Sequence, residues 1–486
     1  MYLEDLFIGY NDGKREAMAR ENFEDYYFNY NGIYNKILEK DKYLVLGRKG
    51  TGKTLLAEYV KKILSRDSNS FCELCSCKSF KFRDLFTLKT KDIKPNEYTA
   101  IWEWLLLIKL AKQIEKDACA EIEAKEKLTK FLNSCFFGYK LNDMNKIVEV
   151  TKGSKITGGF LSKYLSLNKE GNESVKKINC TYLDYLDDLK NTVLQALSTS
   201  ESQYILIFDE LDDQFRNDEL YKSNIISLIK TVDKLNLEFL ESAINAKFVL
   251  MLRTDIFYIL NDADLNKIEQ DCAVKIDWGK VSNENSPLVK MILLKIGQSI
   301  ERNGKKVLSD REIKRKFFSE TFKTPQRTYK PFEFLLARTF LRPRDIITFL
   351  KLVVEKYPKM QYFSEDCVRS VEKEYSEYLL KEIKNEMHGH VEENEIEAAF
   401  TLLRQYKRKN FTFEKMEKYY EDNKEIYDGF DLRRLLNLLF DFGVIGNVWI
   451  DKSRQYYSWK YRENAIIDYQ KKFNIHIGLR KALNIS

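Results

Sequence analysis

The stretch that decides the fold is Tyr43-Leu-Val-Leu46 followed by Gly47-Arg-Lys-Gly-Thr-Gly-Lys53-Thr54. The four apolar residues predict a short buried strand, and the apolar spacing in Leu55-Leu-Ala-Glu-Tyr-Val60 predicts a helix after the loop. The loop itself matches G-x-x-x-x-G-K-[ST], the pattern of a phosphate-binding turn. Its glycines allow backbone N–H groups to turn inward around phosphates, and the following helix directs its positive end toward them. The residues expected to bind a nucleotide here are Gly47, Arg48, Lys49, Gly50, Thr51, Gly52, Lys53 and Thr54.

Two side chains of this loop carry specific chemistry. Lys53 can reach the β- and γ-phosphates of a nucleoside triphosphate, and the Thr54 hydroxyl can ligate Mg²⁺. A glycine-rich turn can match the pattern by chance, but here it stands between a predicted strand and a predicted helix, where the motif must stand. We therefore expect ATP and Mg²⁺ to bind at this loop.

A second motif is Ile205-Leu-Ile-Phe-Asp209-Glu210, which predicts a buried strand with an acidic tip. We expect Asp209 to hold the magnesium shell and Glu210 to orient or deprotonate the attacking water. The alternative is a capped turn, which such a pair often forms. The neighbouring Asp212 and Asp213 are expected to cap the next helix or to remain solvated.

Two arginines complete the predicted site. The strand predicted at Lys247–Leu252 ends in Arg253, whose fixed charge could distinguish a triphosphate from a diphosphate. The alternative is that Arg253 pairs with Asp255 or another carboxylate. Further along, Arg342-Pro-Arg-Asp345 opens a helix, and we favour Arg344 over Arg342 as a nucleotide contact from a second domain. An ordinary helix start explains the same residues equally well.

The composition of the whole chain sets limits on its class. Its 486 residues are 44% hydrophobic, with only 19 Gly and 6 Pro, which excludes wholesale disorder and favours several helix-rich domains. The formal net charge of +7 comes from 81 basic and 74 acidic residues, so any basic surface must be local. No apolar run is long enough to span a membrane, and the first residues do not resemble a secretory signal, so we expect a cytoplasmic protein without membrane contact.

Of the eight cysteines, Cys72, Cys75 and Cys77 form one cluster, for which we favour a buried strand over a zinc site.

The order of these elements predicts an α/β fold. Buried apolar strands that alternate with helices indicate a parallel sheet, with further strands at the cysteine cluster and at Cys272–Ile276. We expect an N-terminal helical segment at 1–40 with an aromatic face, a nucleotide-binding core at 41–280 with an insertion at 118–180, a helical lid at 281–384 and a further domain at 385–486. Within the insertion, 151–159 is rich in glycine and predicts a loop.

Together the motifs resemble the AAA+ and STAND branch of P-loop ATPases, which has an extra strand between the phosphate loop and the acidic strand. The resemblance extends over about residues 40–355. It implies ATP hydrolysis by Lys53, Glu210 and Arg253, with Arg253 ending the sensor strand. It also implies that Arg344 acts as a second sensor in a lid, as in origin-recognition-type ATPases. The chain departs from the family in lacking a clear arginine finger, for which Arg216 and Arg338 are the candidates.

The carboxyl-terminal third resembles a winged helix, the module that often follows the lid in origin-recognition-type ATPases. Two β-prone runs within 442–461 predict a hairpin, and Asp431–Asp441 predicts the third helix, with Arg433 and Arg434. Basic residues concentrate at 301–330 and 452–481, where they are interleaved with aromatic residues in the second segment. These segments suggest contact with nucleic acid, although such runs are more often solvated faces.

Two functions remain open from the sequence. The first is an ATP-dependent switch whose lid and winged helix change position with the nucleotide and engage nucleic acid. The second is a nucleotide-gated scaffold with little turnover that holds or releases an effector protein. The resemblance further implies nucleotide-dependent homo-oligomers and a role in phage defence.

Overall fold

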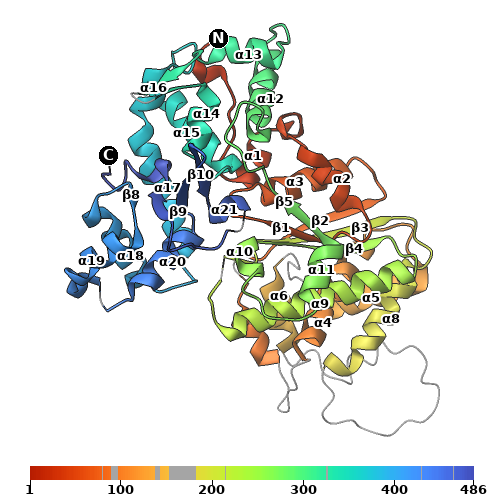
Figure 1. Ribbon diagram of the computed structural model, residues 1–486. Coiled ribbons are helices and arrows are strands. Elements are labelled where there is room, and N and C mark those ends of the chain that lie inside the picture. The colour runs from red at the N-terminus through yellow and green to blue at the C-terminus, as the bar shows by residue number, and fades with distance from the viewer. Residues whose placement is uncertain are drawn as a thin grey trace. The chain divides into compact units, whose positions relative to one another are not determined.

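The computed structural model describes residues 1–78, 80–88, 97–136, 143–152, 182–213, 215–324, 327–427, 429–463 and 465–485. These residues form two compact units (Figure 1). The first, which we call the sheet unit, comprises Asn31–Arg48 and Lys53–Ile276. The second, which we call the helical unit, comprises Met1–Tyr30, Lys49–Gly52 and Asp277–Ser486. The division into four domains stays a prediction.

The sheet unit contains five strands and the helices between them. Its strands are β1 (Leu44–Gly47), β2 (Ser70–Ser76), β3 (Gln203–Asp209), β4 (Ala246–Leu252) and β5 (Ala273–Ile276). Its helices are α2 (Ile33–Leu38), α3 (Lys53–Leu64), η4 (Phe82–Leu88), α4 (Glu97–Ile114), α5 (Ile122–Phe136), α6 (Met144–Lys152), η5 (Tyr182–Tyr185), α8 (Leu186–Leu197), α9 (Glu219–Glu241), α10 (Thr254–Phe257) and α11 (Leu265–Cys272).

All neighbouring strands of this sheet run parallel, in the order β2-β3-β4-β1-β5. Every residue of β1 and β4 is buried, as expected for strands covered on both faces. The predicted extra strand is confirmed, because β4 lies between the strand of the phosphate loop and the acidic strand β3. Cys72 and Cys75 lie in strand β2 and Cys77 follows it, which confirms the strand, but within the strand only Cys75 is buried. The α/β fold with a parallel P-loop-type sheet is therefore established by strand order and direction.

A helical layer made of α4, α5, α6, α8 and α9 packs together in this unit (Figure 1). Its centre is α4, where Trp102 and Trp104 are almost fully buried. Helices α5 and α6 lie in the predicted insertion. The glycine-rich loop predicted at 151–159 lies outside the described residues except for its first two, which end α6.

Two local features differ in part from the prediction. The segment 1–40 is not one helix, because Asn31 and Gly32 adopt left-handed φ angles of 53° and 63° that interrupt helical geometry. It contains short helices instead: η1 (Leu3–Asp5), α1 (Gly13–Ala19), η2 (Phe23–Tyr26), η3 (Tyr30–Gly32) and α2. Of the two alternatives for Asp212 and Asp213, capping of the next helix is contradicted, whereas Asp213 is exposed, as the solvated alternative predicts. The side chain of Asp218 accepts the 2.7 Å hydrogen bond from Tyr221 N that caps α9.

The rest of the helical unit is mainly α-helical. Its lid region contains α12 (Pro287–Arg302), α13 (Asp310–Phe317), β6 (Phe322–Lys323), β7 (Thr328–Tyr329), α14 (Pro331–Ala337), α15 (Pro343–Lys356), α16 (Glu365–Ser370) and α17 (Glu372–Met387). The N-terminal segment packs on this region through a buried ion pair between Glu16 and Lys295, at 2.5 Å. Phe7 N also donates to Ser299 Oγ at 2.9 Å, which fixes the segment against α12.

In the described residues, the last part of the chain contains four α-helices, two short 3-10 helices and a small antiparallel sheet. Its elements are α18 (Glu393–Tyr406), β8 (Asn410–Phe411), α19 (Phe413–Glu421), η6 (Lys424–Tyr427), α20 (Leu432–Asp441), β9 (Ile445–Asp451), β10 (Arg454–Ser458), α21 (Lys460–Glu463), β11 (Lys472–Ile475) and η7 (Ile477–Leu479). The predicted third helix and hairpin are confirmed by α20 and by β9 with β10. The sheet order β10-β9-β11-β8 adds two strands that the sequence pattern did not reveal.

Candidate nucleotide-binding site

The phosphate loop connects the end of β1 at Gly47 to the start of α3 at Lys53. Gly50 and Gly52 have φ angles of +79° and +95°, in the region that residues with a side chain rarely adopt. A Cβ atom on Gly50 would also lie 3.2 Å from Arg344 Cβ. The two glycines are therefore needed for the shape of the loop, and Gly50 also for close packing.

Lys53 lies inside the loop rather than pointing into solvent. Its side chain is buried, and Nζ donates to the carbonyl oxygens of Gly47 at 2.9 Å and Arg48 at 3.3 Å. Burial lowers the pKa of Lys53, while the nearby carboxylates of Asp212 and Asp209 oppose that shift. A cation held in the concavity of a glycine loop fits the binding of phosphate oxygens.

Thr54 and Asp209 lie in direct contact, although 155 residues separate them. Thr54 Oγ1 donates to Asp209 Oδ2 at 2.6 Å, and Asp209 is buried at the carboxyl end of β3. Burial raises the pKa of Asp209 to about 6, against the opposing effects of the Thr54 hydrogen bond and the Lys53 charge. A hydroxyl and a carboxylate side by side at a phosphate loop fit Mg²⁺, which prefers oxygen ligands.

Glu210 follows Asp209 with a left-handed φ of 61°. This unusual backbone turns the chain at the end of β3 and leaves the side chain half-exposed. Ser76, which ends the neighbouring strand β2, donates its hydroxyl hydrogen bond to Glu210 Oε2. No local motif marks Ser76, because its position beside Glu210 depends on the pairing of β2 with β3.

Arg253 follows β4 and is buried. Its Nε donates to Asp255 Oδ1 at 3.1 Å, its Nη2 lies 2.5 Å from Asp255 Oδ2, and its Nη1 lies 3.6 Å from Asp212 Oδ2. This is the carboxylate pairing that the sequence left open as an alternative. The sensor role of Arg253 stays a prediction.

Within the helical unit, the middle of the loop contacts Arg344. Arg344 N donates to Gly50 O at 3.4 Å, and its guanidinium donates to Asn11 O and Glu382 Oε2, each at 3.1 Å. Lys49 Nζ lies 3.7 Å from the same Glu382 oxygen. Glu382 therefore pairs with two cations of the predicted site. It lies in the middle of α17 and carries no local motif that could have revealed it.

The other arginines considered from sequence have internal partners. Arg342 is 1% exposed and pairs with Asp345 at 3.0 Å and with Glu386. Arg338 is also buried, pairs with Glu372 and lies over the ring of Phe334. Arg338 is thus not available as an arginine finger for a neighbouring subunit. Arg216 is exposed.

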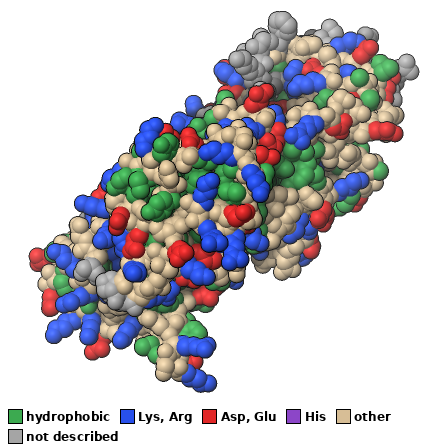
Figure 2. Space-filling model, turned by 90° about the horizontal axis from the view of Figure 1, so that it is seen from above, with side chains coloured by type: hydrophobic (Ala, Val, Ile, Leu, Met, Phe, Trp, Pro, Cys, Tyr) green, Lys and Arg blue, Asp and Glu red, His purple; other side chains and the backbone are tan. Residues whose placement is uncertain are grey.

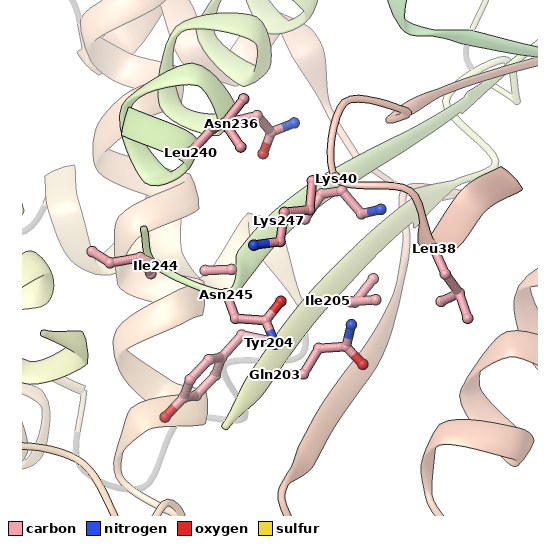
Figure 3. Close-up of a pocket in the computed structure, with 11 residues that line it drawn as sticks. Leu38, Lys40, Gln203, Tyr204, Ile205, Asn236, Leu240, Ile244, Asn245 and Lys247 are labelled. Atoms are coloured by element: carbon pink, nitrogen blue, oxygen red, sulfur yellow. The ribbon is translucent and has the colours of Figure 1, made fainter. Parts of the chain in front are cut away.

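A separate pocket lies at the amino-terminal ends of strands β3 and β4 (Figure 3). Among its lining residues, Lys247 is buried, and its Nζ donates to the carbonyl oxygens of Ile37 and Glu39 at the carboxyl end of helix α2. Burial lowers the pKa of Lys247 to about 8. These contacts make Lys247 a structural link, remote from the carboxyl ends of the strands that carry the nucleotide motifs.

Comparison with known proteins identifies one region of the chain. Residues 287–384, from α12 into α17, match a family model described as the FunZ-associated C-terminal helical domain. This region is similar to that domain. The Aeropyrum pernix ORC1 protein, solved in complex with DNA, matches with 10% sequence identity and a TM-score of 0.38, over 97% of this chain and 96% of that chain. A likeness this weak establishes neither a shared fold nor a shared activity. No curated protein matches the sequence.

In the described part of the chain, no helix combines the length and hydrophobicity needed to cross a bilayer.

Proposed function

We propose that this chain binds ATP with Mg²⁺ and acts as a molecular switch that hydrolyses the nucleotide, at a rate that the sequence does not fix. The observation that supports this most directly is the geometry of the phosphate loop. Gly50 and Gly52 give it an inward-turning backbone, Lys53 is buried within it, and Thr54 contacts Asp209 at the tip of the acidic strand. These residues come from separate parts of the sequence, and binding of a nucleotide with Mg²⁺ requires them to lie close together.

Each residue has a role in the proposed hydrolysis. Lys53 and the loop amides hold the phosphates, and Thr54 with Asp209 would hold Mg²⁺, which supplies positive charge against the charge that develops on the phosphate oxygens. Glu210, positioned by Ser76, accepts a proton from the attacking water as the water oxygen bonds to the γ-phosphorus. The bond from that phosphorus to the β,γ-bridging oxygen breaks, and ADP leaves with the electron pair.

Coupling to the helical unit is proposed to run through Glu382. Its carboxylate pairs with Lys49 of the loop and with Arg344 of α15. Phosphate oxygens suit the same two cations, so a bound triphosphate would compete with Glu382 for them. Release of Glu382 would free α17 from the loop. The Glu382 ion pairs would then exist only without nucleotide, and such a difference in contacts between two states is what a nucleotide-driven change needs.

Two substitutions test the assignment. Lys53→Ala should abolish ATP binding measured by calorimetry, whereas Glu210→Gln should bind ATP and fail to release phosphate. Turnover at the wild-type rate in the Lys53 variant would show that the loop is not the site. Folding of each variant is checked by its thermal unfolding curve, so that loss of structure is not mistaken for loss of function.

We propose nucleic acid as a partner of the carboxyl-terminal region, whose elements suit a winged helix. The third helix, α20, is poorly suited to contact DNA, because both of its arginines already have partners. Arg434 makes two 2.6 Å hydrogen bonds to Glu395, and Arg433 lies over the rings of Phe413 and Tyr469. The hairpin β9–β10 is a better surface, since its exposed residues include Lys452, Arg454, Tyr456 and Tyr457. Its basic and aromatic side chains suit phosphate contact and stacking on bases.

The basic segment 301–330 supports the same proposal less strongly. Most of its Lys and Arg side chains are exposed, but Arg302 pairs with Asp25, and Lys314 with Glu284. On the face seen in Figure 2, basic side chains are interspersed with acidic ones. We therefore expect this segment to add general charge rather than a specific site. Binding of duplex DNA at 50 and 200 mM salt, with and without Lys452→Glu, measures the contribution of the hairpin.

The alternative function is a nucleotide-gated scaffold for an effector protein. Ile450 on the hairpin and Ile466 beyond it are 74% and 86% exposed, which suits contact with a protein as well as with bases. A protein complex that dissociates on ATP addition, without affinity for DNA, would favour this alternative.

Two further expectations rest on the family resemblance. Nucleotide-dependent homo-oligomers would need an arginine finger, and Arg216 is the exposed candidate. Particle mass with ADP and with a non-hydrolysable ATP analogue tests assembly. A role in phage defence is tested by plaque counts on cells that carry either the wild-type chain or Lys53→Ala.

A further inference from the structure

A row of side chains crosses one face of the hairpin β9–β10 in the helical unit. Antiparallel pairing places Tyr456 of β10 directly opposite Trp449 of β9. The two rings are 5.8 Å apart at 17°, which is an offset-stacked arrangement. Lys471, just before β11, places its Nζ 4.1 Å from the centre of the Trp449 ring. These side chains, which we call the hairpin row, come from three segments of the chain.

The hairpin row is anchored in the core of the carboxyl-terminal region. Next to it on the same face of the sheet, Asn447 of β9 lies opposite the fully buried Phe473 of β11. The Asn447 side chain exchanges two 2.8 Å hydrogen bonds with the backbone N–H and carbonyl of Asp468. The Asp468 carboxylate in turn pairs with Lys471 at 3.2 Å. The row therefore has fixed supports on the β11 side.

The turn of the hairpin determines which side chains share this face. Lys452 and Ser453 have left-handed φ angles of 44° and 69°, as a tight two-residue hairpin turn requires. Such a turn sets the register of the two strands. Because successive side chains of a strand point to opposite faces, Tyr457 lies on the other face of the sheet from Tyr456. Only Tyr456 belongs to the hairpin row.

Tyr456 lies at the border of the sheet. In the part of the chain that the structure describes, β10 is the edge strand of the order β10-β9-β11-β8, so no strand follows beyond it. The side chain of Tyr456 is 42% exposed, whereas Trp449 behind it is half-buried. Trp449 thus supports the Tyr456 ring from the inner side, and the outer side of the ring is at the sheet edge. An aromatic ring held in this way suits stacking of a nucleobase, because every base presents a π-face.

The charges around the row suit the phosphates that accompany bases. Arg454 is exposed and stands two residues before Tyr456, on the same face of β10. Lys452 in the turn and Lys472 at the start of β11 are exposed as well. The exposed carboxylate nearest in register is Asp451, opposite Arg454. The positive charge therefore exceeds the negative charge beside an open aromatic ring, which is the combination that single-stranded nucleic acid requires.

We propose that the hairpin row binds single-stranded nucleic acid, with an unpaired base stacked on Tyr456 and the adjoining phosphates on Arg454 and Lys452. This inference rests on the proposed nucleic-acid partner and specifies its class. Inside a duplex, both faces of a base are covered by neighbouring bases, so they are not open to Tyr456. An unpaired base can turn its face to the ring. The row therefore selects unpaired bases, whereas the surrounding cations bind the phosphates of any nucleic acid.

The test separates recognition of bases from recognition of phosphates. Fluorescence anisotropy at one salt concentration measures the affinity of the full chain for a short oligothymidylate, for an abasic deoxyribose-phosphate oligomer of equal length and for a duplex of equal length. We expect Tyr456→Leu to weaken oligothymidylate binding about tenfold and to leave binding of the abasic oligomer and the duplex unchanged. Tyr456→Phe, which keeps the ring, should retain the wild-type affinity. An oligouridylate of equal length shows whether RNA is bound in the same way, and a loss in Tyr456→Leu with either oligomer supports the proposal.

Tyr457→Leu is the matched control, because Tyr457 is a 45% exposed tyrosine of the same strand that lies on the opposite face, across from Val448. Thermal unfolding curves check that each variant is folded. Unchanged affinity of Tyr456→Leu for both single-stranded oligomers, or an equal loss in Tyr457→Leu, would overturn the stacking assignment.

An equal loss of affinity for the abasic oligomer in Tyr456→Leu would also overturn it, because the tyrosine would then act on the phosphates. The proposed nucleic-acid partner would stand in each of these cases. Binding of none of the oligomers by the wild-type chain would instead refute that partner, and this inference with it.

Discussion

Substitution of Glu382 by glutamine tests the proposed coupling most directly. The change keeps the shape of the side chain and removes the charge that pairs with Lys49 at 3.7 Å and with Arg344 at 3.1 Å. At an effective dielectric constant of about 20, each pair has roughly 5 kcal/mol of Coulomb attraction, most of which is offset by desolvation. The three side chains are 18–26% exposed. We therefore assign about 1–2 kcal/mol to the two pairs together.

If a triphosphate must displace Glu382 from both cations, its affinity should rise by that amount when the carboxylate is removed. Glu382→Gln is therefore expected to bind ATP about fivefold to thirtyfold more tightly than the wild-type chain. Isothermal calorimetry at low and moderate salt measures the change, which should shrink as salt screens the pairs. Glu377→Gln on the same helix is the control, since Glu377 is 58% exposed and its partner Lys373 is 3.9 Å away. Weaker ATP binding in Glu382→Gln would show that the carboxylate positions the cations for phosphate instead of competing for them.

Three further predictions concern the site and the hairpin. Ser76→Ala should lower kcat about tenfold with little change in KM, because Ser76 orients Glu210 and does not reach the nucleotide; rates over a range of ATP concentrations separate the two constants. Burial raises the pKa of Asp209 to about 6, so the folded state holds a proton between pH 4 and 6 that the unfolded chain has lost, and ionisation above pH 6 costs stability. Asp209→Asn should therefore be about 2–3 kcal/mol more stable than the wild-type chain at pH 8, with the gain lost near pH 4, as measured by urea unfolding. Arg454→Glu on the hairpin should weaken DNA binding and reduce its salt dependence, whereas Arg434→Ala should not, and the opposite result would make α20 the reading helix.

The part of the site that was predictable is the part built from local sequence. Gly47–Thr54 supplies a whole phosphate loop in one stretch, and Asp209 ends a run of apolar residues. In a parallel sheet the carboxyl ends of all strands lie on the same side. The contact between Thr54 and Asp209 therefore follows from two local patterns, the loop after β1 and the acidic tip of β3. The extra strand between the phosphate-loop strand and the acidic strand was expected from resemblance, whereas the full strand order follows from the observed pairing, including that of β1 with both β4 and β5.

The parts that were missed depend on tertiary packing or on signals that were overlooked. Glu382 looks like any surface glutamate of an amphipathic helix, and only the packing of α17 brings it to Lys49. The N-terminal segment was expected to be helical because its aromatic residues are dense enough to form a packing face. The Asn31-Gly32 pair, which favours left-handed backbone, was the available signal that the helix breaks. Strand β11 is four residues long and pairs between β9 and β8, and such short runs carry little pattern of their own.

The two arginines of Arg342-Pro-Arg344 show why only one of them suits a switch. Arg342 is 1% exposed, and removal of its charge would leave the buried carboxylates of Asp345 and Glu386 without their compensating cation, which is a large energetic cost. We therefore expect its ion pairs to hold the lid region together whether or not a nucleotide is bound. Arg344 and Glu382 are partly exposed, so breaking their ion pair costs little free energy. A new contact between Arg344 and a phosphate would offset about that cost. A ligand can shift an equilibrium only by its differential affinity for the two states, and this pair is one that a triphosphate can outcompete.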